Sequence, residues 1–110
     1  MTLNISEHFV VINLIRKNFV VEAKETKPQK GYNPTWNEPF LFDIPSRDVQ
    51  HYSFDFIVMI GRKYVKDSVI GHVTIGPDTT KTGITHWTEA MSPFGVDIAK
   101  WHNILPRFQY

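Results

Sequence analysis

The chain has 110 residues, which is the length of one ordinary domain. Its hydrophobic fraction of 42% and charged fraction of 21% are typical of a globular protein, and a formal net charge of +1 excludes a strong overall attraction to nucleic acid. The absence of cysteine excludes disulfides and cysteine-based zinc sites. No long apolar run follows a basic amino terminus, so we expect no signal peptide.

The first half of the chain has the patterns of strands. Residues 8–15 form a run of apolar, often β-branched side chains that is dense enough to be buried on both faces. Residues 19–26 alternate in polarity, and the short link 16–18 between the two segments predicts a hairpin. Alternation resumes after a break at 28–31 and predicts a strand over 37–44.

The second half continues this alternation. Residues 52–60 and 69–76 each predict a strand, and the polar segment that starts at Pro45 predicts a loop before the first of them. Together with the first half, these segments predict an all-β protein whose strands are mainly antiparallel.

One helix and one last strand complete the expected elements. The helix is expected over residues 85–91, with Thr85 as its N-cap and Pro93 just behind its end. The last strand is expected over residues 96–104. Several strands with one short late helix favour an antiparallel β-sandwich.

Five segments, in the family's own order, resemble C2 domains of the synaptotagmin type. They are SEHFVV (6–11), NPTWNEPFLFDIP (33–45), IGHVTIG (70–76), HWTEAM (86–91) and IAKWHNI (98–104). The likeness is to the second C2 domain of an atypical, calcium-independent tandem-C2 protein. It implies a C2-type β-sandwich with Greek-key connections and one short helix before the last strand.

The same resemblance suggests that the domain is incomplete at its N-terminus. In the family, two strands precede the segment that SEHFVV matches, and here that segment begins at residue 6. Residues 1–110 are therefore interpreted as a single C2 domain without the family's first two strands. We expect such a domain to expose sheet edges that can pair with another chain.

The family's calcium site is altered in this sequence. The resemblance places its five aspartates on Met1, Glu7, Ile60, Arg62 and Ser68. Calcium takes 6–8 oxygen ligands, largely carboxylates, and of these five residues only Glu7 has a carboxylate. Arg62 adds a permanent positive charge that repels a divalent cation. We therefore expect a calcium-independent domain with no bound metal and no cofactor.

Two basic segments are candidates for contact with acidic phospholipid. Arg62, Lys63 and Lys66 surround Tyr64 in one loop, and a basic loop with an aromatic residue can dock on anionic headgroups. A loop that is merely solvated accounts for the same residues, and both interpretations stay open.

The second basic segment matches the lysine-rich fourth strand of the family. Lys24, Lys27 and Lys30 are its basic residues, but Glu22 and Glu25 dilute their charge. An exposed strand of mixed charge is therefore the simpler interpretation, with a phospholipid site as the alternative.

Trp101 and His102 match a segment that the resemblance associates with vesicle docking and partner contacts. A tryptophan near the end of a last strand usually packs, so we expect packing and keep partner recognition as the alternative. No histidine has another histidine at a metal-binding spacing, and no nucleophile or phosphate-loop motif occurs, so the sequence predicts neither a zinc site nor an enzyme.

The sequence thus predicts a non-catalytic C2 module that binds acidic phospholipid or trafficking proteins without calcium. We expect it to be cytoplasmic and peripheral at membranes, with a nuclear location left open, and we expect no nucleic-acid partner. The alternative is a protein-interaction or structural module without affinity for lipid.

Overall fold

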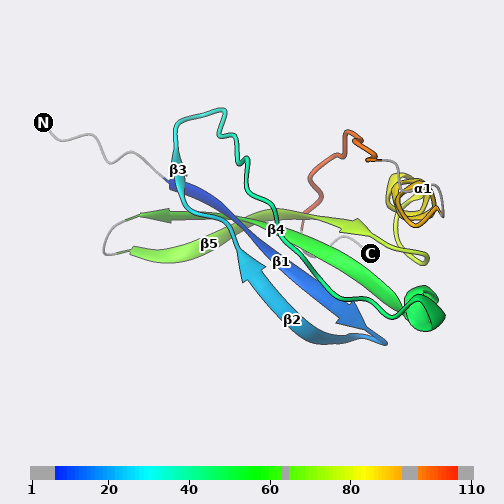
Figure 1. Cartoon of the computed structure of the whole chain (residues 1–110). Coiled ribbons are helices and arrows are strands. Elements are labelled where there is room, and N and C mark those ends of the chain that lie inside the picture. Colours follow the sequence, from blue (N-terminus) through cyan, green and yellow to red (C-terminus); the bar gives the residue numbers. More distant parts are fainter. Residues whose placement is uncertain (1–6, 63–64, 93–96, 107–110) are drawn as a thin grey trace, which may run out of the picture.

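The computed structural model describes residues 7–62, 65–92 and 97–106, and the side chains of residues 62–67 lie outside that description. The chain folds as strands with two helical segments (Figure 1). In chain order these elements are β1 (Glu7–Arg16), β2 (Phe19–Glu25), β3 (Gln29–Lys30), the 3-10 helix η1 (Ser46–His51), β4 (Tyr52–Arg62), β5 (Val65–Ile75) and α1 (Lys81–Ala90).

The strands form one antiparallel sheet with the order β2-β1-β4-β5, and the short β3 pairs with the start of β1. Its register places Leu14 opposite Phe54, and Phe54 opposite Ile75. Directly opposite residues project to the same face, so these three side chains define the inner face of the sheet. The predicted strands over 8–15, 19–26, 52–60 and 69–76 are present, and β5 starts four residues earlier than expected.

The predicted hairpin between β1 and β2 is confirmed. Its two turn residues, Lys17 and Asn18, have φ angles of 48° and 72°. Two successive residues with positive φ form the tight turn whose twist matches that of paired strands, and asparagine tolerates this conformation well. The backbone N–H of Lys17 also donates to the carbonyl of His51 (3.1 Å), which joins the turn to η1.

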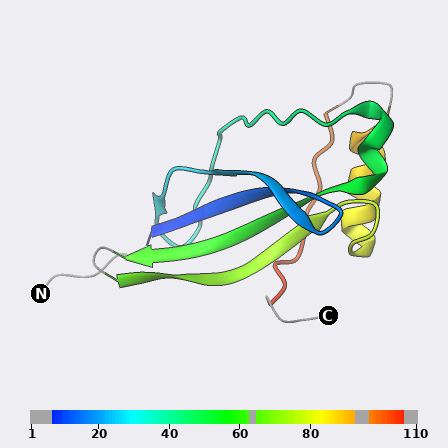
Figure 2. The ribbon, with the colours of Figure 1, turned by 90° about the horizontal axis from the view of Figure 1, so that it is seen from below.

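The expected strand over 37–44 is not formed as a paired strand. The segment is extended and crosses the inner face of the sheet, and its side chains alternate as predicted, with Phe40, Phe42 and Ile44 half-buried and Leu41 and Asp43 exposed (Figure 2). Within the described residues, no backbone–backbone hydrogen bond joins 31–44 to another segment. The alternation was therefore predicted correctly, whereas the pairing was not. Side-chain alternation indicates which residues are buried, but it does not indicate which strand lies alongside.

The helix starts four residues earlier than expected, and Thr85 does not cap it. Thr80 is the N-cap, and its hydroxyl accepts a hydrogen bond from the backbone N–H of Gly83 (3.1 Å). The Thr85 hydroxyl instead donates to the carbonyl of Lys81 (3.0 Å) inside the helix. Threonine is a suitable N-cap at either position, so the sequence alone does not distinguish them. In the structure β5 ends at Ile75 and α1 begins at Lys81, which places Thr80 at the helix start.

The expected last strand over 96–104 is also not formed. Val96 lies outside the described residues, and 97–104 has no regular secondary structure. A single bridge follows, in which His72 and Leu105 exchange two backbone hydrogen bonds of 2.9 Å. Gly71 allows this approach, since a β-carbon there would lie 2.5 Å from Cγ2 of Ile104.

The fully covered part of the core lies at one end of the molecule, which we call the helix end because it holds α1 and η1 (Figure 1). Leu14, Tyr52 and Trp87 form its buried cluster. Five half-buried side chains pack against this cluster: Phe42, Ile44, Val49, Phe54 and Ile75. The Phe54 ring contacts those of Phe42 (5.1 Å between centroids) and Trp87 (5.9 Å), which joins the sheet to the crossing segment and the helix.

The opposite end, which we call the loop end, holds the start of β1, β3, the end of β4 and the start of β5 (Figure 1). Inner-face residues toward this end, including Val10, Val58 and Ile60, are only half-buried. The architecture is the predicted antiparallel β-sandwich class, with a hydrogen-bonded sheet as one layer and extended segments across it as the other.

Candidate functional site

The loop end holds the described residues that were predicted at the degenerate calcium positions, with Glu7 on the opposite face of the sheet from Ile60 and Ser68. Glu7 pairs with Gly61, and Ile60 pairs with Ser68. These pairings place Glu7, Ile60 and Ser68 at one end of three neighbouring strands. Ile60 contributes a half-buried hydrocarbon side chain, and Ser68 contributes an exposed hydroxyl.

The remaining predicted residues of this end are described only in part. The backbone of Arg62 ends β4 and pairs with Val65, while its side chain lies outside the description. Met1, Lys63 and Tyr64 lie outside the described residues, as does the side chain of Lys66. Across the described ranges, no three histidine, aspartate or glutamate side chains converge as a metal site requires.

The three lysines of the second basic segment differ in their surroundings. Lys24 is held by three groups: its ammonium donates to the carbonyl of Leu41, lies 3.4 Å from Glu22 Oε1 and sits 4.6 Å from the centroid of the Phe42 ring. Lys27 and Lys30 are exposed. The charge of Lys24 is thus partly satisfied within the domain, which leaves Lys27 and Lys30 as the more available pair.

Trp101 and His102 point to opposite environments. Trp101 is 97% exposed, so the expectation that it packs is wrong. His102 is half-buried, and its Nε2 lies 2.8 Å from Nδ1 of His86 in α1. Because the two rings are nearly parallel and their centroids are 5.1 Å apart, this short contact is edge to edge rather than face to face.

The contacts of His86 fix the protons of this histidine pair. Its Nε2 lies 3.2 Å from the carbonyl oxygen of Ile98, which only an N–H group can satisfy. In the neutral pair, Nδ1 of His86 therefore accepts a hydrogen bond from Nε2–H of His102. Burial, and to a smaller extent the charge of His86, lower the pKa of His102 below its ordinary value of 6.5.

The pair joins the helix to the C-terminal segment, and an ion pair supports it. Nζ of Lys100 lies 2.8 Å from Oε2 of Glu89, one helical turn beyond His86. Together these contacts leave Trp101 projecting from a segment that is fixed on both sides. Sequence reasoning missed the histidine pair because its members are 16 residues apart. The only available signal was that each belongs to a matched motif, HWTEAM or IAKWHNI.

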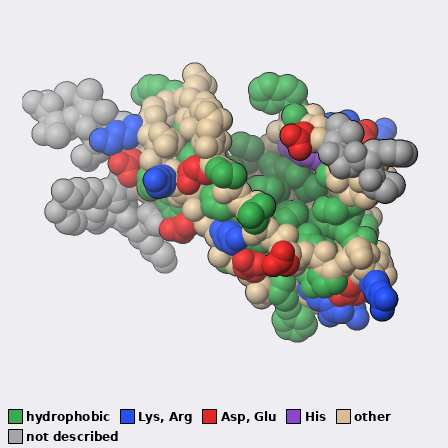
Figure 3. All heavy atoms as spheres, viewed as in Figure 1, with side chains coloured by type: hydrophobic (Ala, Val, Ile, Leu, Met, Phe, Trp, Pro, Cys, Tyr) green, Lys and Arg blue, Asp and Glu red, His purple; other side chains and the backbone are tan. Residues whose placement is uncertain are grey.

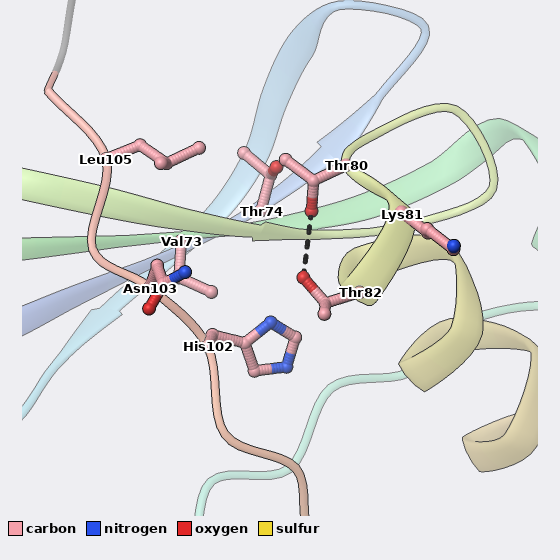
Figure 4. A pocket seen from close by; sticks show the side chains of 8 residues that line it. All are labelled: Val73, Thr74, Thr80, Lys81, Thr82, His102, Asn103 and Leu105. Carbon is pink, nitrogen blue, oxygen red and sulfur yellow. Dashed lines mark hydrogen bonds between the residues drawn. The ribbon is translucent and has the colours of Figure 1, made fainter.

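A pocket of about 230 Å³ lies beside this junction. Figure 4 shows the ring of His102 from the C-terminal segment next to Thr82 at the start of α1, with Asn103 beside Val73 of β5. The hydroxyls of Thr80 and Thr82 lie 3.4 Å apart. Among the described residues that line it, no carboxylate accompanies Lys81 and His102, so the pocket lacks the paired acid and base that hydrolytic sites use.

Residues 2–90 match the family model described as "C2 domain". The chain is a synaptotagmin-type C2 domain. It is 30% identical to human (Homo sapiens) Synaptotagmin-5 and to human Synaptotagmin-2 over 103 residues, which is 93% of this chain. It is 32% identical to human Synaptotagmin-4 over 99 residues, or 89% of this chain.

The C2 domain is only part of each relative. The alignment covers 27% of Synaptotagmin-5, 25% of Synaptotagmin-2 and 23% of Synaptotagmin-4, so the chain spans about a quarter of the length of these relatives. The match confirms the family and fold that the five sequence motifs predict. Within the described part of the chain, neither helical segment has the length and apolar character needed to cross a bilayer.

Proposed function

We propose that this C2 domain is a non-catalytic module that binds acidic phospholipid surfaces without calcium, in a cytoplasmic role at trafficking membranes. The observation that carries the proposal is the chemistry of the loop end. At the positions where the resemblance places calcium ligands, Glu7 offers one carboxylate on one face of the sheet, and Ile60 and Ser68 offer a hydrocarbon and a hydroxyl on the other, whereas a calcium ion needs several charged oxygens together.

The sequence between β4 and β5 supports the choice of lipid. β4 ends at Arg62 and β5 begins at Val65 at the loop end, and Arg62, Lys63 and Lys66 are the basic residues of this stretch of the sequence. Each basic residue near an anionic membrane surface contributes about 1 kcal/mol of attraction. Tyr64 adds an amphipathic ring of the kind that favours the membrane interface. The exposed Lys27 and Lys30 form a second, weaker basic surface.

Vesicle co-sedimentation tests this proposal. The domain is mixed with phosphatidylcholine vesicles that contain or lack phosphatidylserine, with added calcium or a chelator. We expect binding that needs phosphatidylserine, ignores calcium and weakens with salt. The change Lys63→Ala with Lys66→Ala should weaken binding about thirty-fold, at about 1 kcal/mol for each lost charge.

The matched control removes the same charge elsewhere. Arg47 and Lys81 are exposed residues outside the loop end, and changing both to alanine should leave vesicle binding within about twofold. Equal losses in the two variants would contradict a local site, and binding that requires calcium would contradict the proposal as a whole.

The alternative is a protein-interaction module without lipid affinity. The specific observation in its favour is Trp101, which is 97% exposed on a segment fixed by the His86–His102 contact. A rigidly presented tryptophan is typical of a protein-binding hot spot. No pelleting at low salt, combined with retention of a protein partner that Trp101→Ala abolishes, would favour this function over lipid binding.

A further inference from the structure

Three strands share one row of residues at the loop end. Lys30 of β3 lies opposite Glu7 of β1, and Glu7 lies opposite Gly61 of β4. Both β3 and β4 are antiparallel to β1, and β1 starts at Glu7, so both strands run toward the loop end. The residues that follow Lys30 and Gly61 therefore continue past this row in the same direction.

Tyr32 lies just beyond this row on the side of β3. The chain turns at Gly31, whose φ angle of 105° is one that residues with a side chain rarely adopt. After this turn Tyr32 is 101% exposed, so its ring is left entirely in water. Figure 3 shows hydrophobic side chains that project from the surface at the loop that follows β3.

The basic residues next to this ring are also exposed. Lys27 and Lys30 precede Tyr32 in the loop and in β3, and both are exposed. The backbone N–H of Lys27 donates to Oε2 of Glu38 (2.9 Å), which ties the start of the loop to the crossing segment. None of the ion pairs between described residues uses either lysine. A single exposed aromatic ring is common on protein surfaces, but a ring accompanied by two available ammonium groups is a specific combination.

This combination lies close to the basic stretch that begins at Arg62. β3 and β4 pair with Glu7 from its two sides, and neighbouring strands lie about 4.8 Å apart, so the two chain segments pass the row about 10 Å from each other. Arg62 directly follows Gly61, and Tyr32 follows Lys30 after the turn. A flat surface that approaches the loop end can therefore meet both segments at once.

The flat surface that fits this chemistry is an acidic phospholipid membrane. The membrane interface suits tyrosine, because the ring enters the apolar edge while the hydroxyl stays among hydrated headgroups. Ammonium groups beside the ring meet the negative charge of the same headgroups. An acidic protein surface is the alternative occupant, and the vesicle experiment below decides between the two.

We propose that Tyr32 is a second membrane anchor of the loop end, whose ring enters the interface of an acidic phospholipid surface while Lys27 and Lys30 contact the headgroups. This anchor rests on the phospholipid binding proposed above and adds an orientation to it. The row of β3, β1 and β4 at the loop end faces the membrane, and the helix end points away from it. Charge draws the domain to the membrane, and the ring fixes how it sits there.

A single dye tests the anchor, because the chain contains no cysteine. Tyr32→Cys gives one site for a nitrobenzoxadiazole label. Phe19→Cys gives the matched control, since Phe19 is 75% exposed at the start of β2, beside the turn that contacts η1. Each labelled domain is mixed with phosphatidylcholine vesicles that contain phosphatidylserine, in the presence of a chelator. We expect the emission at position 32 to rise at least about twofold and shift to the blue, and the emission at position 19 to stay unchanged.

Co-sedimentation of the same samples separates the anchor from phospholipid binding itself. Pelleting with an unchanged dye at position 32 would overturn the anchor, leave phospholipid binding intact and point to a protein surface as the occupant of Tyr32. Equal dye changes at positions 32 and 19 would show adsorption without orientation and would also overturn the anchor. No pelleting would contradict both proposals.

Two substitutions test the native ring. Tyr32→Ala should weaken vesicle binding about fivefold, because it removes apolar area that the membrane covers, whereas Tyr32→Phe should stay within about twofold. The fold loss in Tyr32→Ala should persist at high salt, while that of Lys27→Ala with Lys30→Ala should shrink, since salt screens charge and not apolar contact. Phe19→Ala is the matched control and should bind as the unmodified domain does. A Tyr32→Ala loss that disappears at high salt, or that Phe19→Ala equals, would contradict the anchor.

Discussion

The two ends of this C2 domain differ in how completely their apolar side chains are covered. At the helix end, Leu14 and Trp87 are almost completely buried and the crossing segment packs on them through Phe42 and Ile44. Toward the loop end, Val10, Val58 and Ile60 on the same face of the sheet are only half-buried. A domain that is held together at one end can tolerate large sequence change at the other, which is where we propose that phospholipid binds.

The comparison is sharpest in the core. Trp87→Ala should lower the free energy of unfolding by about 3–5 kcal/mol, because it removes a buried ring that contacts Phe54. Val58→Ala, on the same inner face toward the loop end, should cost only about 1 kcal/mol because that side chain is half-exposed. Urea unfolding of both variants measures the difference, and equal losses would show that the two ends are covered alike.

A glycine in the helix tests the same end more finely. A β-carbon at Gly83 would collide with the carbonyl oxygen of Thr74 and the hydroxyl of Thr79. Gly83→Ala should therefore lower the free energy of unfolding by about 1–3 kcal/mol, although alanine favours helices. Thr88→Ala, at an exposed position of the same helix, should be neutral or slightly stabilising. Stabilisation by Gly83→Ala would show that the helix is not packed closely against β5.

Much of this division could be predicted from sequence, because side-chain alternation reports burial. The alternation over 37–44 is correctly predicted and places Phe40, Phe42 and Ile44 on the inward face, and the hairpin predicted from the link 16–18 is present. Backbone pairing could not be predicted for 37–44 or 97–104, since it depends on which strands lie alongside. The exposure of Trp101 was also missed, because the position of a tryptophan in the sequence does not show which neighbours cover its ring in the fold.

Acidification should loosen the junction between α1 and the C-terminal segment. The pKa of His102 in the folded domain lies below its ordinary value of 6.5, so the unfolded chain binds the proton more readily. The contribution of neutral His102 to the free energy of unfolding is complete above pH 6.5. It is lost as the pH falls through the lower pKa of the folded domain. The urea midpoint should fall more between pH 7.5 and 5.5 in the unmodified domain than in His102→Asn, and the same fall in both would contradict this origin.

The smallest effect concerns the ion pair that joins β1 to η1. Nε of Arg16 lies 2.5 Å from Oδ2 of Asp48, and this hydrogen bond lowers the pKa of Asp48 below 3.8. Its stabilisation is present above that ordinary value and is lost as the pH falls through the lowered one. Asp48→Asn should slightly lower the urea midpoint at pH 7, and the difference should vanish in strong acid. A difference that persists below pH 2 would mean that the ion pair is not its source.

The most direct test of calcium independence is a calcium titration followed by the backbone amide resonances of the loop end. With calcium raised to millimolar concentration, the amides of Glu7, Ile60 and Ser68 should show only small shifts that do not saturate, and no larger than those of Thr88 at the helix end. Saturable shifts confined to Glu7, Ile60 and Ser68 would establish a calcium site at the loop end and contradict the account.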